Sequence, residues 1–226
     1  SVLSESFVLY WPRDIVAGDF YWLEEVGEYV FVAVADCTGH GVPGAMMSVL
    51  CSGALRRAVL EEGIMETGLI LDRVRAEVVE QVHRGGVGLR DGMDVVLIRF
   101  RRGDMRWVQF SGANRRLWVV RPSGQVVEVE GDRQPVGYVE WARPFRSEEV
   151  VLEEGSMLYL FTDGYVDQLG GTSGRKLGTK RLREWVLELH RESCAVQGER
   201  FGGYFEGWRG GMPQVDDVTL VGLRVV

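Results

Sequence analysis

The chain has 226 residues and a hydrophobic share of 46%, which is enough for one domain with a sizeable core. Its formal net charge of −7 argues against a nucleic-acid surface or an anionic-membrane binder, because both need clustered lysine and arginine. Three cysteines without a CxxC pair suit a reducing compartment, and no apolar run reaches the ~18 residues of a membrane span. We therefore expect residues 1–226 to be a single cytoplasmic domain without direct membrane insertion. Because no methionine begins it, we expect it to be excised from a longer regulatory protein.

The first half of the chain reads as strands followed by a helical hairpin. Short runs that are solidly apolar, or that alternate apolar and polar residues, predict three strands, at Phe7–Trp11, Asp19–Val26 and Tyr29–Ala35. Helical patterns then run from Pro43 to about Glu61 and from Glu66 to about Arg84, with a break near Gly63. Pro43 suits the first turn of a helix, where its missing N–H costs little.

The second half returns to strands and ends with one clear amphipathic helix. Five strands are predicted, at Asp94–Arg101, Arg106–Ser111, Leu117–Arg121, Val126–Glu130 and Ser156–Thr162. Apolar residues spaced at i, i+3, i+4 and i+7 predict a helix over Thr179–Glu192, and we expect a short helix near Glu199–Trp208 before a last strand at Val218–Val226. Glycine-rich surface loops are expected at residues 83–92 and 169–178. This order predicts an α+β layered domain and not βαβ alternation.

Aspartates stand at the ends of several predicted strands. Asp36 and Asp163 each end an apolar run, whereas Asp19 and the pair Asp216 and Asp217 each begin one. Carboxylates gathered at a low-dielectric edge repel one another unless cations lie between them or some become protonated. Oxygen ligands of this kind suit Mg²⁺ or Mn²⁺, whereas Zn²⁺ would want histidine or cysteine. Aspartate also favours turns for purely structural reasons, so a metal site and a set of turn residues both stay open at this point.

Six segments carry a family resemblance. They are VAGDFYW, VAVADCTGHGVPGAMMS, DGMDVVLIRF, FSGANRRLWVV, LYLFTDGYVD and VDDVTLVGLRV, and they occur in that order from about Leu9 to the C-terminus. They resemble the motifs of the bacterial SpoIIE-like serine phosphatases, a branch of the metal-dependent PPM (type 2C-like) protein phosphatase superfamily. The resemblance implies a central β-sandwich of two antiparallel sheets, flanked by helices on both sides in an α-β-β-α order.

The resemblance also implies roles for particular residues. Asp36 matches the carboxylate that bridges two Mn²⁺ or Mg²⁺ ions, and the backbone carbonyl of Cys37 matches a further ligand. Asp163 and Asp216 match ligands of the second metal, and Asp19 matches an acidic residue that supports the metal shell through water. The implied mechanism is direct attack of metal-activated hydroxide on phosphoserine or phosphothreonine, with no phosphoenzyme.

Three positions depart from the wider superfamily. Arg13 is in a different context from the N-terminal phosphate-binding arginine of the eukaryotic branch, so the residues that bind substrate are unassigned. Ala113 occupies the place of an acidic ligand for a third metal. His40 lies four residues after Asp36, where the eukaryotic general acid follows by two, so we expect it to cap a turn. The acid that protonates the leaving group is therefore also unassigned.

The implied substrate is a phosphoprotein, such as an anti-sigma-factor antagonist of the STAS type in a partner-switching pathway. The resemblance further implies an N-terminal sensor or regulatory domain, with the hairpin at residues 43–84 transmitting its signal and contributing to a homodimer. Two alternatives stay open: a catalytically silent phosphatase fold that binds partners, and a metal-dependent hydrolase of small phosphate esters. The presence of all the core aspartates favours an enzyme over the silent module.

Overall fold

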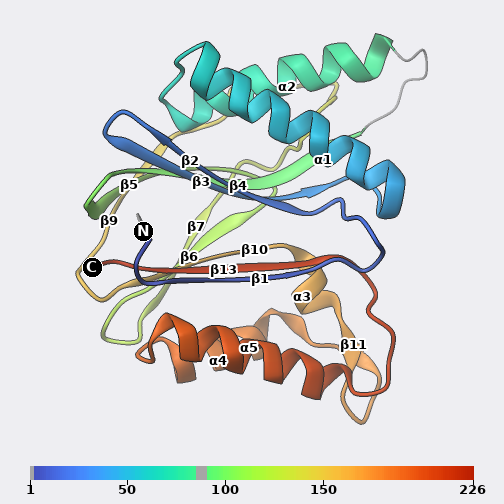
Figure 1. Cartoon of the computed structure of the whole chain (residues 1–226), viewed down its shortest axis with the longest axis vertical. Coiled ribbons are helices and arrows are strands. Elements are labelled where there is room, and N and C mark those ends of the chain that lie inside the picture. Colours follow the sequence, from blue (N-terminus) through green and yellow to red (C-terminus); the bar gives the residue numbers. More distant parts are fainter. Residues whose placement is uncertain (1–2, 85–90) are drawn as a thin grey trace.

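Two antiparallel sheets stack face to face at the centre of the protein (Figure 1). The computed structural model describes residues 3–84 and 91–226. The first sheet contains, in spatial order, β1 (Ser6–Trp11), β13 (Val218–Arg224), β10 (Met157–Phe161), β6 (Arg116–Val120) and β7 (Val126–Glu130). The second contains β2 (Phe20–Val26), β3 (Tyr29–Cys37), β4 (Gly92–Arg101), β5 (Asp104–Ala113) and β9 (Glu148–Val151), with β8 (Val136–Gly137) paired to β4.

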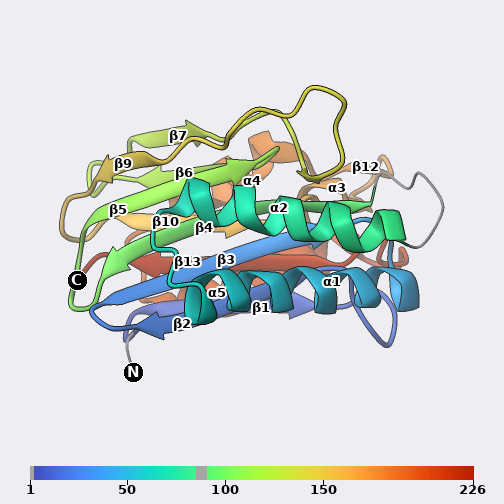
Figure 2. The same cartoon turned by 90° about the horizontal axis from the view of Figure 1, so that it is seen from above.

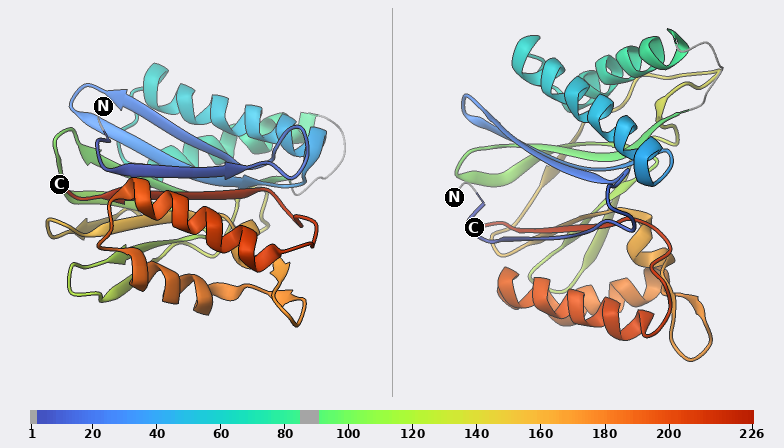
Figure 3. Two further views of the ribbon diagram at one scale, coloured as in Figure 1. Left: turned by 60° about the horizontal axis from the view of Figure 1, so that its bottom comes forward. Right: turned by 45° about the vertical axis from the view of Figure 1, so that its right-hand side comes forward.

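Helices cover the outer face of each sheet. Figures 1 and 2 show α1 (Gly41–Arg56) and α2 (Thr67–Arg84) side by side over the second sheet; a π-helical turn, η1 (Arg57–Glu61), ends the first of them. Both views in Figure 3 show α4 (Gly178–Leu189) and α5 (Cys194–Arg209) against the first sheet. The expected sandwich flanked by helices is confirmed. No helix in the part of the chain that the structure describes is long and apolar enough to cross a membrane.

The layers explain why β3 is solidly apolar rather than alternating. Val30, Val32 and Val34 face the core between the two sheets, whereas Phe31 and Ala33 face the core beneath α1 and α2. A strand buried on both faces has no position for a polar side chain until it leaves the core. The strand therefore fixes the backbone of its last residues between two packed layers.

Most predicted elements agree with the structure, and the differences are local. The hairpin breaks where expected, and Gly63 there has a φ of +67°. The helix expected near Glu199–Trp208 is longer than predicted, because α5 (Cys194–Arg209) begins five residues earlier. Ser193 caps its N-terminus, where the hydroxyl accepts a hydrogen bond from the Val196 N–H. The expected loop at 169–178 contains a two-stranded ribbon, β11 (Leu169–Gly170) and β12 (Arg175–Lys176). Of the loop expected at 83–92, residues 85–90 lie outside the described residues.

Candidate metal centre

The predicted aspartates come from the ends of strands in both sheets. Asp36 stands near the end of β3, where the strand register pairs it with Asp94 of β4. Asp163 follows β10 and begins the short helix α3 (Asp163–Asp167), and Asp216 precedes β13, the neighbour of β10 in the first sheet. Figure 1 shows α3 and the beginning of α1 at the same end of the sandwich. Sheet topology thus brings residues that are far apart in sequence to one end of the molecule.

Close backbone packing places Asp163 beside Asp216. A Cβ added to Gly164 would lie 1.8 Å from the carbonyl oxygen of Asp217 and 3.4 Å from the Asp216 Cβ. No residue with a side chain fits at position 164 unless the backbone moves. Glycine in the TDG motif is therefore required by the contact between α3 and residues 216–217.

Arg115 joins Asp36 to Asp163. Its Nη2 donates to Oδ2 of Asp36 at 2.5 Å and to Oδ2 of Asp163 at 3.0 Å, and it lies 3.7 Å from Oδ2 of Asp94. The Arg115 side chain is only 15% exposed. The Asn114 amide donates to Oδ1 of Asp94 at 2.8 Å, which draws the β5–β6 turn toward β4. Two predicted ligands therefore meet at one guanidinium.

Sequence reasoning missed both Arg115 and Asp94. Asp94 could have been found only from the β3–β4 register, and the helical hairpin separates these strands in the sequence. Arg115 lies in the SGANRR segment, in which Ala113 occupies the place of an acidic ligand and is fully buried. Its direction depends on Asn114, which adopts a left-handed φ of +52°.

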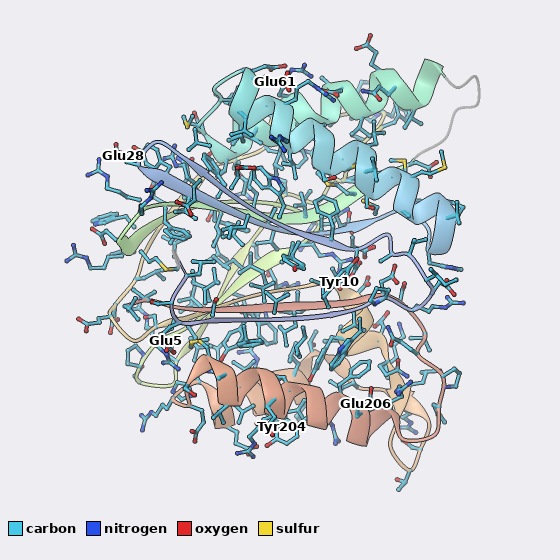
Figure 4. All side chains as sticks on the ribbon, in the orientation of Figure 1. Glu5, Tyr10, Glu28, Glu61, Tyr204 and Glu206 are labelled. Atoms are coloured by element: carbon cyan, nitrogen blue, oxygen red, sulfur yellow. The ribbon has the colours of Figure 1, made fainter. Side chains whose placement is uncertain are left out.

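Asp19 is buried and held by hydroxyl groups. Its Oδ2 accepts hydrogen bonds from Thr162 Oγ1 at 2.7 Å and from Thr219 Oγ1 at 2.8 Å. Burial raises the pKa of Asp19 to about 7, although these two hydrogen bonds oppose the increase. Tyr10, labelled in Figure 4, donates its hydroxyl to the backbone carbonyl of Asp19 at 3.2 Å. Asp19, which precedes β2 of the second sheet, is thus fixed by hydroxyl groups at the end of the first sheet, one of them on Thr162 directly before Asp163.

Asp216 and Asp217 have different environments. The Asp217 side chain is buried and accepts hydrogen bonds from the backbone N–H groups of Arg13 and Gly18, both at 2.8 Å. Asp216 is exposed, but desolvation of its carboxyl group by the surrounding protein still raises the pKa of that group. Asp217 therefore anchors the chain before Asp19, which leaves Asp216 as the exposed carboxylate of the pair.

The corner after Asp36 turns tightly, as the sequence predicts. Gly39 has a φ of +87°, and a Cβ on Gly44 would lie 2.2 Å from the Gly39 carbonyl oxygen. The expected capping role of His40 is wrong, because it stands at the N-cap of α1 without a side-chain capping bond. Instead, Nδ1 of its exposed ring lies 3.2 Å from Oδ2 of Asp14.

The electrostatics of the cluster favour an added cation. Burial raises the pKa of Asp36 to about 8, and repulsion from Asp19 and Asp163 adds to the increase while Arg115 opposes it. The carboxylate oxygens are the hard donors that Mg²⁺ and Mn²⁺ prefer. Among the described residues, no three histidine, cysteine or acidic side chains are already grouped to hold an ion. The donor set fits a divalent cation, provided that the guanidinium between Asp36 and Asp163 moves.

The raised pKa values predict a pH-dependent stability of the metal-free protein. A carboxyl group whose pKa is higher in the folded than in the unfolded protein stabilises the fold when the pH is below its unfolded pKa of about 4. That contribution to stability is lost as the pH rises through its pKa in the folded protein. In EDTA, Asp36→Asn should therefore gain thermal stability relative to wild type between about pH 5 and pH 9. Asp104→Asn is the control, because hydrogen bonds from Arg106 lower the pKa of Asp104 to about 2. The difference in Tm between Asp104→Asn and wild type should therefore stay constant over this pH range. Parallel melting curves for Asp36→Asn and wild type across this range would contradict the prediction.

Known proteins share the family and the fold of this chain. The family model described as stage II sporulation protein E (SpoIIE) matches residues 27–226. The SiaA-PP2C domain of Pseudomonas aeruginosa is 32% identical with a TM-score of 0.87, over 98% of this chain and 86% of that one. The RsbU and RsbW domains of Rv1364c from Mycobacterium tuberculosis are 18% identical with a TM-score of 0.77, over 99% of this chain and 60% of that one. RsbX in complex with magnesium is 14% identical with a TM-score of 0.66, over 98% of this chain and 94% of that one. A search of curated proteins found no match.

Proposed function

This chain belongs to the SpoIIE family and has a PP2C-type phosphatase fold, and from that premise we propose that it is a metal-dependent protein serine/threonine phosphatase. The observation that carries the proposal is the meeting of Asp36 and Asp163, from different sheets, at a single guanidinium. Asp216 lies beside Asp163 through the Gly164 contact. The presence of these three carboxylates argues against a catalytically silent binding module.

We assign the metal-binding role to Asp36, Asp163, Asp216 and the backbone carbonyl of Cys37, with Asp19 as a supporting carboxylate. When bound, two Mn²⁺ or Mg²⁺ ions would lower the pKa of water and offset the charge on the phosphoryl oxygens. The magnesium of the RsbX complex supports a divalent cation in this fold. The Cys37 thiol is not available as a nucleophile, because its hydrogen bond with Cys51 and its burial raise its pKa. Direct attack by water is therefore the mechanism that these residues favour.

The proposed substrate is a phosphoserine or phosphothreonine on a regulatory protein, such as a STAS-type anti-sigma-factor antagonist. The RsbW domain that accompanies RsbU in the Mycobacterium tuberculosis protein supports a role in signal transduction of this kind. We also propose a cytoplasmic location, which the three buried free thiols of Cys37, Cys51 and Cys194 support.

We propose that the helical hairpin contacts either an N-terminal sensor domain or a second copy of the chain. Three apolar side chains of α1 support this role, since they are 67 to 73% exposed: Val42, Met46 and Val49. A row of exposed apolar residues on one helix is typical of a surface that another protein covers.

The test of the proposed activity is hydrolysis of a phosphoserine peptide and of p-nitrophenyl phosphate, with Mn²⁺ and with EDTA. We expect turnover with Mn²⁺ and none above background with EDTA, and Mn²⁺ binding by calorimetry. Absence of both turnover and Mn²⁺ binding would exclude the phosphatase. A higher kcat/KM on a phosphorylated regulatory protein than on aryl phosphates would separate a protein phosphatase from a hydrolase of small esters.

A further inference from the structure

Arg115 occupies the space that a shared metal would need. One nitrogen, Nη2, makes all three of its carboxylate contacts, to Asp36, Asp163 and Asp94. A cation bound jointly by Asp36 and Asp163 would bind the same Oδ2 atoms. Nη2 lies between the two Oδ2 atoms, at the position that a cation shared by them would take, and Coulomb repulsion between two positive charges at this distance disfavours binding of both at once.

Arg115 is kept in this position by the contacts of Nη2 with these carboxylates, and not by hydrogen bonds along its whole side chain. Its Nε is buried and has no hydrogen-bond partner in the described part of the chain. Arg146, in contrast, uses several nitrogens, with Nε donating to Asp132 at 2.8 Å and Nη1 lying 3.2 Å from Glu148. An arginine held through one nitrogen can leave without breaking other side-chain bonds.

Space for the displaced guanidinium lies next to its present position. A hollow of about 470 Å³ is lined by Arg115 itself and, among others, by Asn114, Trp118, Asp163 and Lys180. Because Arg115 and Asp163 both line it, the guanidinium can turn into this hollow while staying beside the metal ligands. A guanidinium there presents a fork of N–H donors that matches two phosphoryl oxygens.

We propose that Arg115 alternates between two positions, one within the metal site and one in the adjoining hollow, and that it contacts the substrate's phosphoryl group from the second. In the metal-free protein it offsets the repulsion between Asp36 and Asp163, and divalent cations displace it when they bind. This inference rests on the proposed function, since it assumes a metal at these carboxylates. It gives the site a phosphoryl-binding residue, a role that sequence reasoning left unassigned.

Calorimetry with Mn²⁺ alone tests the first position. Arg115→Gln removes the competing charge, so its Kd for Mn²⁺ should be about tenfold lower than that of wild type. Arg115→Lys keeps a charge and should return the Kd toward the wild-type value. Arg116→Gln is the matched control, because Arg116 pairs with Glu128 and Glu130 and its loss tests only the general change in charge. It should shift the Kd far less than Arg115→Gln.

Inorganic phosphate tests the second position. With saturating Mn²⁺, Arg115→Gln should bind phosphate about tenfold more weakly than wild type, and Arg115→Lys should recover only part of that loss. An equal or higher Kd for Mn²⁺ in Arg115→Gln would overturn the displacement, and unchanged phosphate binding would overturn the phosphoryl contact. If neither wild type nor Arg115→Gln binds Mn²⁺, the proposed function itself fails. Circular dichroism confirms that each variant is folded.

Discussion

Asparagine in place of Asp36 should reduce Mn²⁺-dependent hydrolysis of a phosphoserine peptide by about a thousandfold, the loss typical of removing one group that stabilises transition-state charge. The substitution keeps the shape of the side chain but removes the negative charge that a divalent cation needs. The backbone contacts of β3 with β4 should persist, because they do not involve the side chain. The measurement is kcat/KM with Mn²⁺, together with the Kd for Mn²⁺, which should rise in parallel.

Asp104→Asn is the control for this experiment. It makes the same chemical change at the first residue of β5, where Asp104 pairs with Arg106, and it should leave kcat/KM at the wild-type value. Turnover of Asp36→Asn within about threefold of wild type would remove Asp36 from the metal site. Because the metal-free Asp36→Asn protein should be at least as stable as wild type above neutral pH, a loss of activity cannot be attributed to unfolding.

Local patterns in the sequence were sufficient to predict the layered fold. The solidly apolar run ending at Asp36 predicts a strand over Tyr29–Ala35, and β3 contains it, buried on both faces. Gly63 marks the hairpin break without any knowledge of packing. The sequence failed where an element has too few residues for a pattern: α3 has five residues, and β9 is a four-residue edge strand in which half-buried positions alternate with exposed ones. Periodicity needs longer segments to be visible.

The site was less accessible to sequence reasoning than the fold, because it depends on register between distant strands. Asp36, Asp163, Asp216 and Asp19 were assigned by family motifs, and their metal-binding roles stay predictions. Nothing local distinguishes Arg115 from Arg116, its neighbour. The left-handed Asn114 sends Arg115 toward the carboxylates, whereas Arg116 pairs with Glu128 on β7. Only the three-dimensional structure therefore distinguishes Arg115, which belongs to the site, from Arg116, which forms an ion pair at the surface.

A second large effect is expected from Gly164→Ala. Its Cβ would lie 1.8 Å from the Asp217 carbonyl oxygen, so either α3 or residues 216–217 must move. Overpacking against backbone should lower the free energy of unfolding by about 3 kcal/mol, which corresponds to about 10 °C in Tm for a domain of this size. Activity should fall further than stability alone explains, since the movement separates Asp163 from Asp216.

Gly203→Ala tests whether the loss comes from that contact and not from replacing glycine in a helix. Gly203 is exposed on α5, and nothing lies within 4 Å of an added Cβ. Alanine there should raise the free energy of unfolding by about 1 kcal/mol through helix propensity, with no change in activity. Opposite signs for the two substitutions, measured by urea unfolding, would show that α3 is pressed against residues 216–217. A neutral Gly164→Ala would mean that these segments lie further apart and that Asp163 and Asp216 do not share a site.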